Sequence, residues 1–368
     1  MDIPFLKKIL PPQFSFRFLS GKPDHVVGVD IGVSSTKVVQ LRYDGQRAIL
    51  ETYGELLNEG YFKSAEGTGA GFLRYLDSDI VSLLGDVFKE SQVTTREAVF
   101  SIPATASFVT TISLPKIARK EIENAIPFEA RKYVPIPLSE VVLDWDIFPS
   151  EEARNTVDIL LVAVPREIVD KFERVAQAAH LHIRALEVET FSLVRALVKQ
   201  DPLPTAIINF GSHSTTLAIV DNGKLRMSHN FSRGSLELTR SLERGLMVNR
   251  ERAESLKRDV GLSERIEERE ITSIMAPLVD GLLSEIERLI SQYNRHGERH
   301  VQKINLTGGG SNLRGLIERT ALRFGVEVTR GDPFSRIVSP AFMQPILRSI
   351  GPSFSVAVGL ALHEITTQ

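Results

Sequence analysis

A short segment of this chain occurs twice, and the repeat limits the possible folds more than any other feature of the sequence. Residues 206–217 match residues 27–38 at a constant offset of 179 positions (209 minus 30). Each copy consists of an apolar run, a turn of small residues and a second apolar run, which predicts a β-hairpin. A further turn follows each copy, at Asp44-Gly45 and at Asp221-Asn222-Gly223, and such sequences are strong hairpin signals. We therefore expect two lobes of similar build.

The two repeated turns contain the residue types that a phosphate group requires. Backbone N–H groups bind phosphate at close range, and only glycine or another small residue lets the main chain approach without a Cβ atom in the way. Lys37, on the returning strand of the first hairpin, is long enough to reach a phosphate. The predicted phosphate-binding residues are Gly32, Val33, Ser34, Ser35 and Lys37 from the first lobe, and Gly211, Ser212, Ser214 and Thr215 from the second.

A third turn, rich in glycine, follows the strand predicted at residues 303–306. It leads into a helix that we expect at residues 312–324, and the N-terminus of a helix attracts anions. Any one of the three turns alone is more often a sharp turn without a ligand. Their joint order along the chain favours a nucleotide, ATP or ADP, held between the lobes. The third turn would face the ribose and the inner phosphates through Gly308, Gly309, Gly310 and Asn312.

Three polar side chains are candidates for the chemistry of this site. Asp30 ends the first strand of the first hairpin, where its carboxylate is suited to hold a hydrated Mg²⁺. Asn209 is the matching residue of the second hairpin and a weaker candidate metal ligand, because an amide brings no negative charge. Fast ATP hydrolysis is therefore not expected. Glu189 has two equally good interpretations: it orients the attacking water, or it caps the helix that begins there.

The repeats also divide the chain into predicted domains. We expect an N-terminal arm at residues 1–25, a first lobe at 26–99 and 189–204, and an inserted subdomain at 100–188. The second lobe is predicted at 205–240 and 303–368, with a helical subdomain at 241–302 and a C-terminal helix that packs back on the first lobe.

Composition excludes several classes of function. The 44 basic and 46 acidic residues give a net charge of -2, so no strong field is present that would hold nucleic acid. No apolar run approaches the roughly 18 to 20 residues of a membrane-spanning helix, and we expect a cytoplasmic protein with no direct membrane span. The absence of cysteine excludes disulfides, thiolate metal sites and cysteine nucleophiles.

With these motifs the chain resembles the PilM family, actin-like cytoplasmic proteins of type IV pilus assembly that are related in fold to the cell-division protein FtsA. The resemblance covers almost everything from Val26 to Leu362, and its segments are residues 27–37, 121–137, 188–191, 209–215, 306–310 and 357–361. It implies an α/β, actin-like (ASKHA) fold with two RNase H-like lobes and an inserted small subdomain of the FtsA and PilM type. It also implies ATP or ADP with Mg²⁺, and a scaffold role at the inner membrane through the cytoplasmic N-terminal peptide of the membrane protein PilN.

Residues 121–137 point to the PilM family and not to actin-like proteins in general. Phe128 and Tyr133 in this segment are candidates for lining a peptide groove between the inserted subdomain and the first lobe. The alternative is core packing, which we expect for at least one of the two. Pro127 is unusual for the family's helix and predicts a kink or a second helix starting there.

Two other functions occur on the same superfold. A small-molecule kinase would need a buried aspartate near the γ-phosphate, whereas Asp144 and Asp146 fall in the inserted subdomain, away from the predicted cleft. A filament-forming cytoskeletal ATPase would need subunit surfaces that the sequence does not reveal. The leading hypothesis is a scaffold, in which the nucleotide sets the angle between the lobes and thereby the affinity for a partner peptide.

Overall fold

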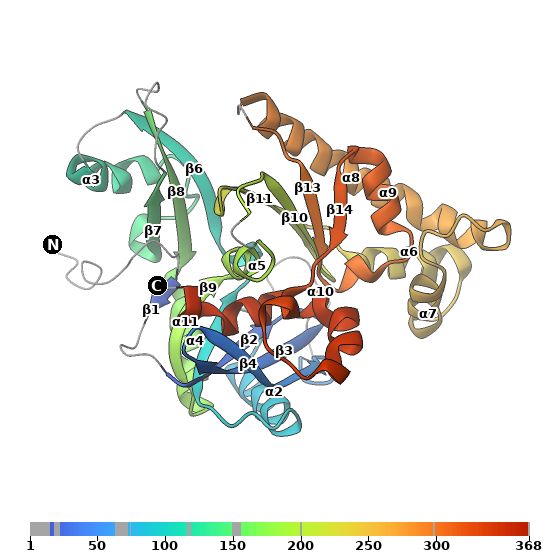
Figure 1. The fold of residues 1–368 in the computed structure, drawn as a ribbon, viewed down its shortest axis with the longest axis horizontal. Coiled ribbons are helices and arrows are strands. Elements are labelled where there is room, and N and C mark those ends of the chain that lie inside the picture. Colours follow the sequence, from blue (N-terminus) through green and yellow to red (C-terminus); the bar gives the residue numbers. More distant parts are fainter. Residues whose placement is uncertain are drawn as a thin grey trace.

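The computed structural model describes residues 15–17, 23–62, 73, 75–115, 119–148, 156–198, 201–296 and 299–366. Most of the predicted arm, including Phe5, Leu6, Ile9 and Leu10, lies outside the described residues. The described part forms two lobes, each built on its own β-sheet, with a third, smaller sheet beside them (Figure 1).

The first lobe is a six-stranded sheet covered by helices on both faces. Its strand order is β1-β9-β5-β2-β3-β4, with β2, β5 and β9 parallel to one another. Helices α2 and α4 cover one face and α5 and α10 the other, so strands β2, β3 and β5 bury apolar side chains on both sides. The elements are β1 (Ser15–Arg17), β2 (His25–Ile31), β3 (Ser35–Asp44), β4 (Arg47–Leu57), β5 (Glu97–Ile102), β9 (His182–Val188), α2 (Asp77–Glu90), α4 (Arg166–Ala178), α5 (Glu189–Leu197) and α10 (Gln344–Ala361).

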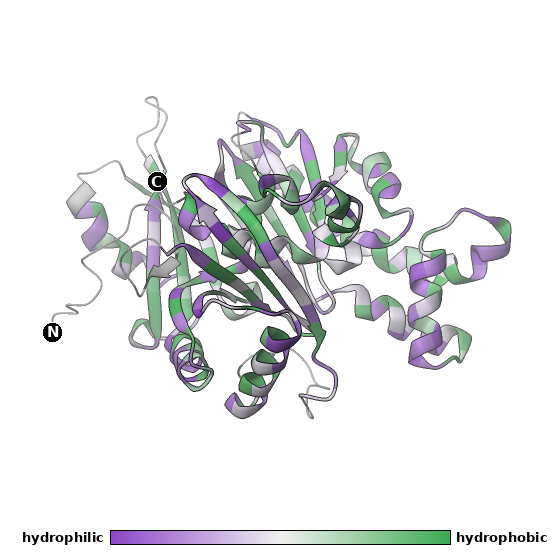
Figure 2. Ribbon diagram, turned by 60° about the horizontal axis from the view of Figure 1, so that its bottom comes forward, coloured by the Kyte–Doolittle hydropathy of each residue, from purple (hydrophilic) through white to green (hydrophobic). Residues whose placement is uncertain are grey.

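The second lobe repeats the hairpin and adds two parallel strands. Its sheet has the order β12-β11-β10-β13-β14, and helices α6, α7, α8 and α9 contribute to the core on one face. Its elements are β10 (Thr205–Phe210), β11 (Thr215–Asp221), β12 (Lys224–Phe231), β13 (Lys303–Thr307), β14 (Glu327–Arg330), α6 (Ser235–Leu246), α7 (Arg250–Val260), α8 (Arg269–His296) and α9 (Leu316–Phe324). Figure 2 shows hydrophobic residues concentrated in the central strands and many hydrophilic residues on the helices around them.

Helices α5 and α10 hold the two lobes together. Leu193 of α5 packs in the first lobe's core, while Phe191 and Val194 pack against the second lobe's sheet. Helix α10 lies so close to β2 that a Cβ atom on Gly28 would come within 2.2 Å of the Ala357 carbonyl oxygen. The short helix α11 (His363–Thr366) follows α10. Helix α10 therefore packs on the sheet of the first lobe.

The inserted sheet is formed by residues 108–165, a shorter segment than the subdomain predicted at residues 100–188. Its order is β6-β8-β7, from β6 (Phe108–Pro115), β8 (Thr156–Pro165) and β7 (Val141–Ile147), and α3 (Arg119–Ala130) covers one face. Strand β9 and helix α4 belong instead to the first lobe, because β9 pairs in parallel with β5 and α4 packs in the same core. The predicted boundary at 188 was therefore wrong.

Single residues affect where three of the helices begin, continue or end. The charged segment from residue 235 to 258 forms parts of two helices, because Met247 adopts a left-handed conformation (φ 52°) that ends α6. The helix predicted from residue 312 begins at Leu316, after Gly315 with φ 79°. Pro127 lies inside α3, which continues to Ala130 without a second helix starting there.

Two further observations concern the membrane and the arm. Among the described helices, none is long and apolar enough to cross a bilayer. Strand β1, the described part of the arm, pairs antiparallel with β9, with Phe16 opposite Leu186. The short segments η1 (Ala104–Ala106), η2 (Leu138–Glu140), η3 (Ile266–Glu268), η4 (Gly309–Asn312), η5 (Pro333–Arg336) and η6 (Ala341–Met343) are 3₁₀ turns.

Candidate functional site

The predicted site residues meet where parallel strands of both lobes end. In the first lobe, Asp30, Ser101 and Glu189 lie at the carboxyl ends of β2, β5 and β9. In the second lobe, Asn209 and Thr307 lie at the carboxyl ends of β10 and β13. Ligands of α/β proteins bind at this edge of a parallel sheet, because the chain leaves each strand there in a loop.

The two repeated turns have the same geometry and touch each other. The N–H of Gly32 donates to the Ser35 carbonyl at 3.1 Å, and the N–H of Gly211 donates to the Ser214 carbonyl at 3.0 Å. A Cβ atom at either glycine would lie 2.8 Å from that same carbonyl oxygen, which explains why each turn needs glycine.

Across the cleft, Ser34 Oγ donates to Ser212 Oγ at 2.6 Å. The structure thus brings the first turn (Gly32, Val33, Ser34, Ser35) against the second (Gly211, Ser212, Ser214, Thr215), as the sequence predicts.

Lys37 is held beside the first turn by two partners. Its Nζ donates to Ser35 Oγ at 2.6 Å and pairs with a Glu55 carboxylate oxygen at 3.0 Å. Glu55, on β4, is a residue that sequence reasoning missed, and the lysine, Ser35 and Arg258 of α7 lower its carboxyl pKa against the effect of burial.

Two half-buried carboxyl groups lie at the base of the cleft. Burial raises the pKa of Asp30, while Lys37 and a hydrogen bond from Ser101 Oγ at 2.8 Å partly counter the rise. Burial and the nearby Asp30 together raise the pKa of Glu189 to about 7. A cation near this pair would stabilise both ionised forms.

The contacts of Glu189 distinguish between its two interpretations. Its carboxylate accepts the backbone N–H of Ala104 at 3.1 Å, and a hydrogen bond with Thr216 lowers its pKa. Helix α5 has Val188 at its N-cap and no side-chain cap hydrogen bond. Glu189 thus contacts the first lobe's loop after β5 and the second lobe's hairpin, and its side chain does not cap α5.

The glycine turn lies beside the second hairpin and supports it. Gly308 has φ 81°, and a Cβ atom there would come within 2.5 Å of Asn209 Oδ1. A Cβ atom on Gly310 would lie 2.8 Å from the Phe210 ring, whereas one on Gly309 would meet nothing within 4 Å. Gly309 therefore borders open space, and Asn312, at the end of the same 3₁₀ turn, is exposed.

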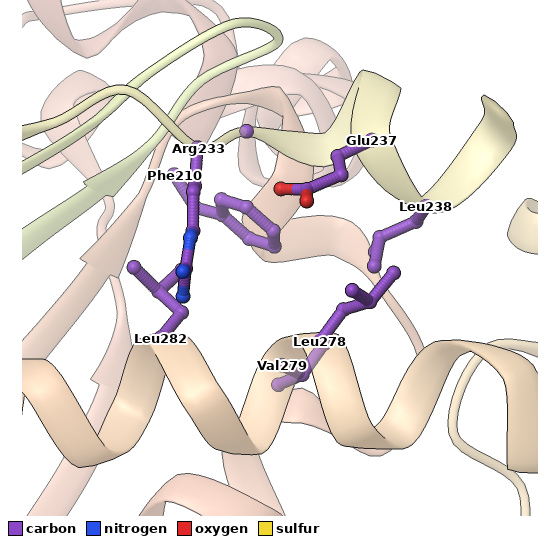
Figure 3. A pocket seen from close by; sticks show the side chains of 8 residues that line it. Phe210, Arg233, Glu237, Leu238, Leu278, Val279 and Leu282 are labelled. Atoms are coloured by element: carbon purple, nitrogen blue, oxygen red, sulfur yellow. The ribbon is translucent and has the colours of Figure 1, made fainter. Parts of the chain in front are cut away.

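A small cavity of about 10 Å³ lies in the second lobe next to the second turn. Figure 3 shows Arg233, Glu237 and Phe210 around it, with Leu238 of α6 at the right and leucine and valine side chains of α8 below. Because α9 begins only at Leu316, the positive end of that helix is four positions further along the chain than predicted. The helix N-terminus expected at Asn312 is therefore not there, and Asn312 instead ends the 3₁₀ turn.

The donor set at the cleft fits a magnesium ion bound mostly through water and phosphate. Among the described residues no group of three or more histidine, cysteine or acidic side chains converges to hold a metal. Mg²⁺ commonly uses one or two carboxylates, substrate phosphates and several waters. Asp30 would supply a carboxylate, and Asn209 only an amide oxygen.

Phe128 and Tyr133 are both exposed, at 65% and 44%. The expectation that at least one of them packs in the core was therefore wrong. Alternate residues of β8 point to opposite faces of the inserted sheet: Ile159 and Leu161 pack with α3, and Leu160 and Val162 pack toward the lobes. Phe128, on α3, thus belongs to the side facing away from the lobes, and not to a groove between the subdomain and the first lobe.

Sequence comparison identifies relatives over most of the chain. The family model described as type IV pilus assembly protein PilM matches residues 28–365. FtsA of Rhizobium meliloti (strain 1021) is 28% identical over 232 residues, covering 56% of this chain and 51% of FtsA. FtsA of Enterococcus hirae is 20% identical over 350 residues, covering 82% and 77%. The chain thus spans about half the length of the first of these relatives.

Solved structures show the same architecture. A PilM–PilN type IV pilus biogenesis complex superposes with a TM-score of 0.79 at 23% identity, covering 92% of this chain and 98% of the matched chain. The ethanolamine utilization protein EutJ from Carboxydothermus hydrogenoformans has a TM-score of 0.54 at 16% identity, covering 93% and 90%. MreB5 of Spiroplasma citri bound to AMPPNP has a TM-score of 0.50 at 12% identity, covering 92% and 95%. The predicted actin-like fold is confirmed, and with a family match over nearly its whole length the chain belongs to the PilM family of type IV pilus assembly proteins.

Proposed function

We propose that this chain binds ATP or ADP with Mg²⁺ between its lobes and acts as a scaffold of the pilus assembly platform, with the cytoplasmic N-terminal peptide of PilN as its partner. The observation that carries the proposal is the meeting of the two repeated turns, Ser34 Oγ to Ser212 Oγ at 2.6 Å. A phosphate group bound there would receive donors from both lobes and would therefore set the angle between them.

Different residues around the cleft would bind the phosphates, the metal ion and water. The backbone of both turns and of Gly309 would bind the phosphates, Lys37 would neutralise charge, and Asp30 would hold Mg²⁺ through water. Mg²⁺ would supply charge neutralisation at the phosphates. Glu189 would accept a proton or orient water, but the amide at Asn209 leaves the second lobe without a carboxylate, so hydrolysis is expected to be slow.

The inserted sheet contacts the second lobe directly, which supports control of the partner by the nucleotide. Thr111 Oγ1 of β6 donates to the Arg226 carbonyl of β12 at 2.8 Å, and the Arg226 guanidinium lies 4.4 Å from the Phe148 ring centroid. Lys224 pairs with Asp146 at 3.5 Å across the same junction. Because the sheet packs on both lobes, a change in their angle must move it relative to at least one of them.

The exposed aromatic residues of the inserted subdomain are the proposed partner contacts. Phe128 and Tyr133 present apolar surface to solvent at 65% and 44% exposure, on or just beyond α3. A peptide with apolar side chains would bury this surface. Inner-membrane association would then follow from the partner. Asp146, in the inserted sheet, forms an ion pair with Lys224 of the second lobe. No observation favours the alternative that the chain is a small-molecule kinase.

Titration of a labelled PilN N-terminal peptide into the protein, with and without MgATP, tests this proposal. We expect MgATP to change the peptide affinity, and Phe128→Glu to abolish peptide binding without changing the thermal unfolding midpoint. Leu322→Glu is the matched control, because Leu322 is 89% exposed on α9 of the second lobe. Peptide binding that is unaffected by both MgATP and Phe128→Glu would contradict the proposal.

A further inference from the structure

We infer that Asn58 is a positioning residue for the first phosphate turn, where its side-chain amide replaces the backbone donors that a helix N-terminus supplies to the second turn. The inference deepens the proposed nucleotide site and rests on it. Asn58 directly follows β4 and is 3% exposed.

In the second lobe, the start of α6 fixes the turn. The N–H of Ser235 donates to the Gly211 carbonyl at 2.9 Å, and the N–H of Leu236 donates to the Ser212 carbonyl at 2.9 Å. Gly234 is packed so closely that a Cβ atom would lie 2.3 Å from the Ser212 carbonyl oxygen. The backbone entering α6 therefore holds two carbonyls of the turn in place.

In the first lobe, residues 58–62, which the structure describes directly after β4, form a turn and not a helix, and the Tyr61 N–H donates to the Asn58 carbonyl at 3.1 Å. Instead, Asn58 Nδ2 donates to the Gly32 carbonyl at 2.8 Å and lies 3.4 Å from the Val33 carbonyl. At the offset of 179 positions, these carbonyls match those of Gly211 and Ser212. One side-chain amide thus serves the same two acceptors as two backbone N–H groups in the other lobe.

A third hydrogen bond of Asn58 also has a counterpart in the second lobe. Thr36 Oγ1 donates to Asn58 Oδ1 at 3.0 Å, and its counterpart Thr215 Oγ1 donates to the Arg233 carbonyl at 2.7 Å. The backbone N–H of Asn58 also donates to the Ser34 carbonyl at 3.0 Å. Asn58 is therefore the residue of the first lobe that fixes Gly32, Ser34 and Thr36 together.

The chain offers a matched control in Gln40. This residue is 2% exposed, and its amide braces the same hairpin at the other end, where it accepts the Thr94 N–H at 2.8 Å and donates to Glu51 at 2.7 Å. Asn58→Leu and Gln40→Met each replace a buried amide with an apolar side chain of similar size. The two variants lose comparable hydrogen bonding, and only one loses the brace on the phosphate turn.

The test combines hydrogen exchange of the ligand-free protein with titration of MgATP. We expect Asn58→Leu to speed amide exchange in residues 32–36 but not in residues 211–215, and to weaken MgATP binding by at least about tenfold, which corresponds to about 1.4 kcal/mol. Gln40→Met should do neither. Asn58→Asp, which keeps an acceptor for Thr36 but loses the donors, should behave like Asn58→Leu and serves if that variant does not fold.

Unchanged exchange in residues 32–36 together with MgATP affinity within about twofold of the wild type would overturn the inference. Equal weakening by Gln40→Met would overturn it as well, since a general loss of stability would then explain the effect. If the wild type binds no MgATP, the proposed nucleotide site fails, whereas the exchange measurement still decides whether Asn58 holds the turn.

Discussion

Replacing Glu189 with glutamine is expected to stabilise the ligand-free protein at alkaline pH. Burial and the neighbouring Asp30 raise the pKa of Glu189 from its ordinary 4.5 to about 7. The folded protein therefore binds this proton more tightly than the unfolded chain does. The stability associated with the neutral carboxyl is fully present below about pH 4.5 and is lost as the pH rises through about 7.

The magnitude follows from the size of the shift. A difference of about 2.5 pKa units is equivalent to about 3 kcal/mol once the group is ionised in both states. Glutamine carries no charge, and its amide oxygen can still accept the Ala104 N–H that Glu189 accepts at 3.1 Å. Glu189→Gln should therefore raise the free energy of unfolding by about 3 kcal/mol near pH 8 and by less than about 1 kcal/mol near pH 5.

Urea unfolding of both proteins at the two pH values measures this difference. A gain of equal size at both pH values would show that packing, and not ionisation, is responsible. No gain in the free energy of unfolding near pH 8 would refute the claim that the ionised Glu189 carboxylate destabilises the folded protein. Asp30→Asn provides a comparison, because removing the neighbouring charge should lower the pKa of Glu189 and reduce the effect.

Three further outcomes are expected. Gly309→Leu should prevent nucleotide binding yet leave the unfolding midpoint unchanged, because a Cβ atom there meets no protein atom within 4 Å; nucleotide binding as tight as in the wild type, measured by calorimetry, would contradict the placement of the turn. Asn209→Asp should raise ATP hydrolysis in a phosphate-release assay, and wild-type turnover on the order of 1 per second or faster would refute the reading of Asn209 as a missing carboxylate. Deleting residues 2–20 should leave PilN-peptide binding intact or tighter, and a folded truncated protein that loses the peptide would identify the arm as the binding element.

Local patterns predicted the hairpins and their turns, because a β-hairpin with a small-residue turn is specified by neighbouring residues. The repeat predicted two matching turns, and Gly32 and Gly211 have matching geometry in the structure, which also places Asp30 opposite Lys37. The partners at the base of the cleft were missed because they come from separate strands. Ser101 and Ala104 reach Asp30 and Glu189 only through the parallel pairing of β5 with β2 and β9.

Long-range contacts also explain the errors at the inserted subdomain. Strand β9 carries no local mark of the sheet it joins, and its pairing with β5 assigns it to the first lobe. The exposure of Phe128 depends on which stripe of α3 faces the sheet, and Ile122, Ile126 and Ala130 take that position. Asn58 belongs to no sequence motif, since its role depends on the turn at residues 58–62, where the second lobe has the start of α6.

Calorimetric titration of the wild-type protein with ATP in the presence of Mg²⁺ tests the central claim most directly. The two turns, the glycine turn and Asp30 predict one saturable site per chain, with Gly309→Leu as the variant that lacks it. Saturable binding of ATP and ADP by the wild type, and its loss in the variant, is the expected result. No heat of binding at millimolar nucleotide, roughly the weakest affinity such a site would have, would contradict the account.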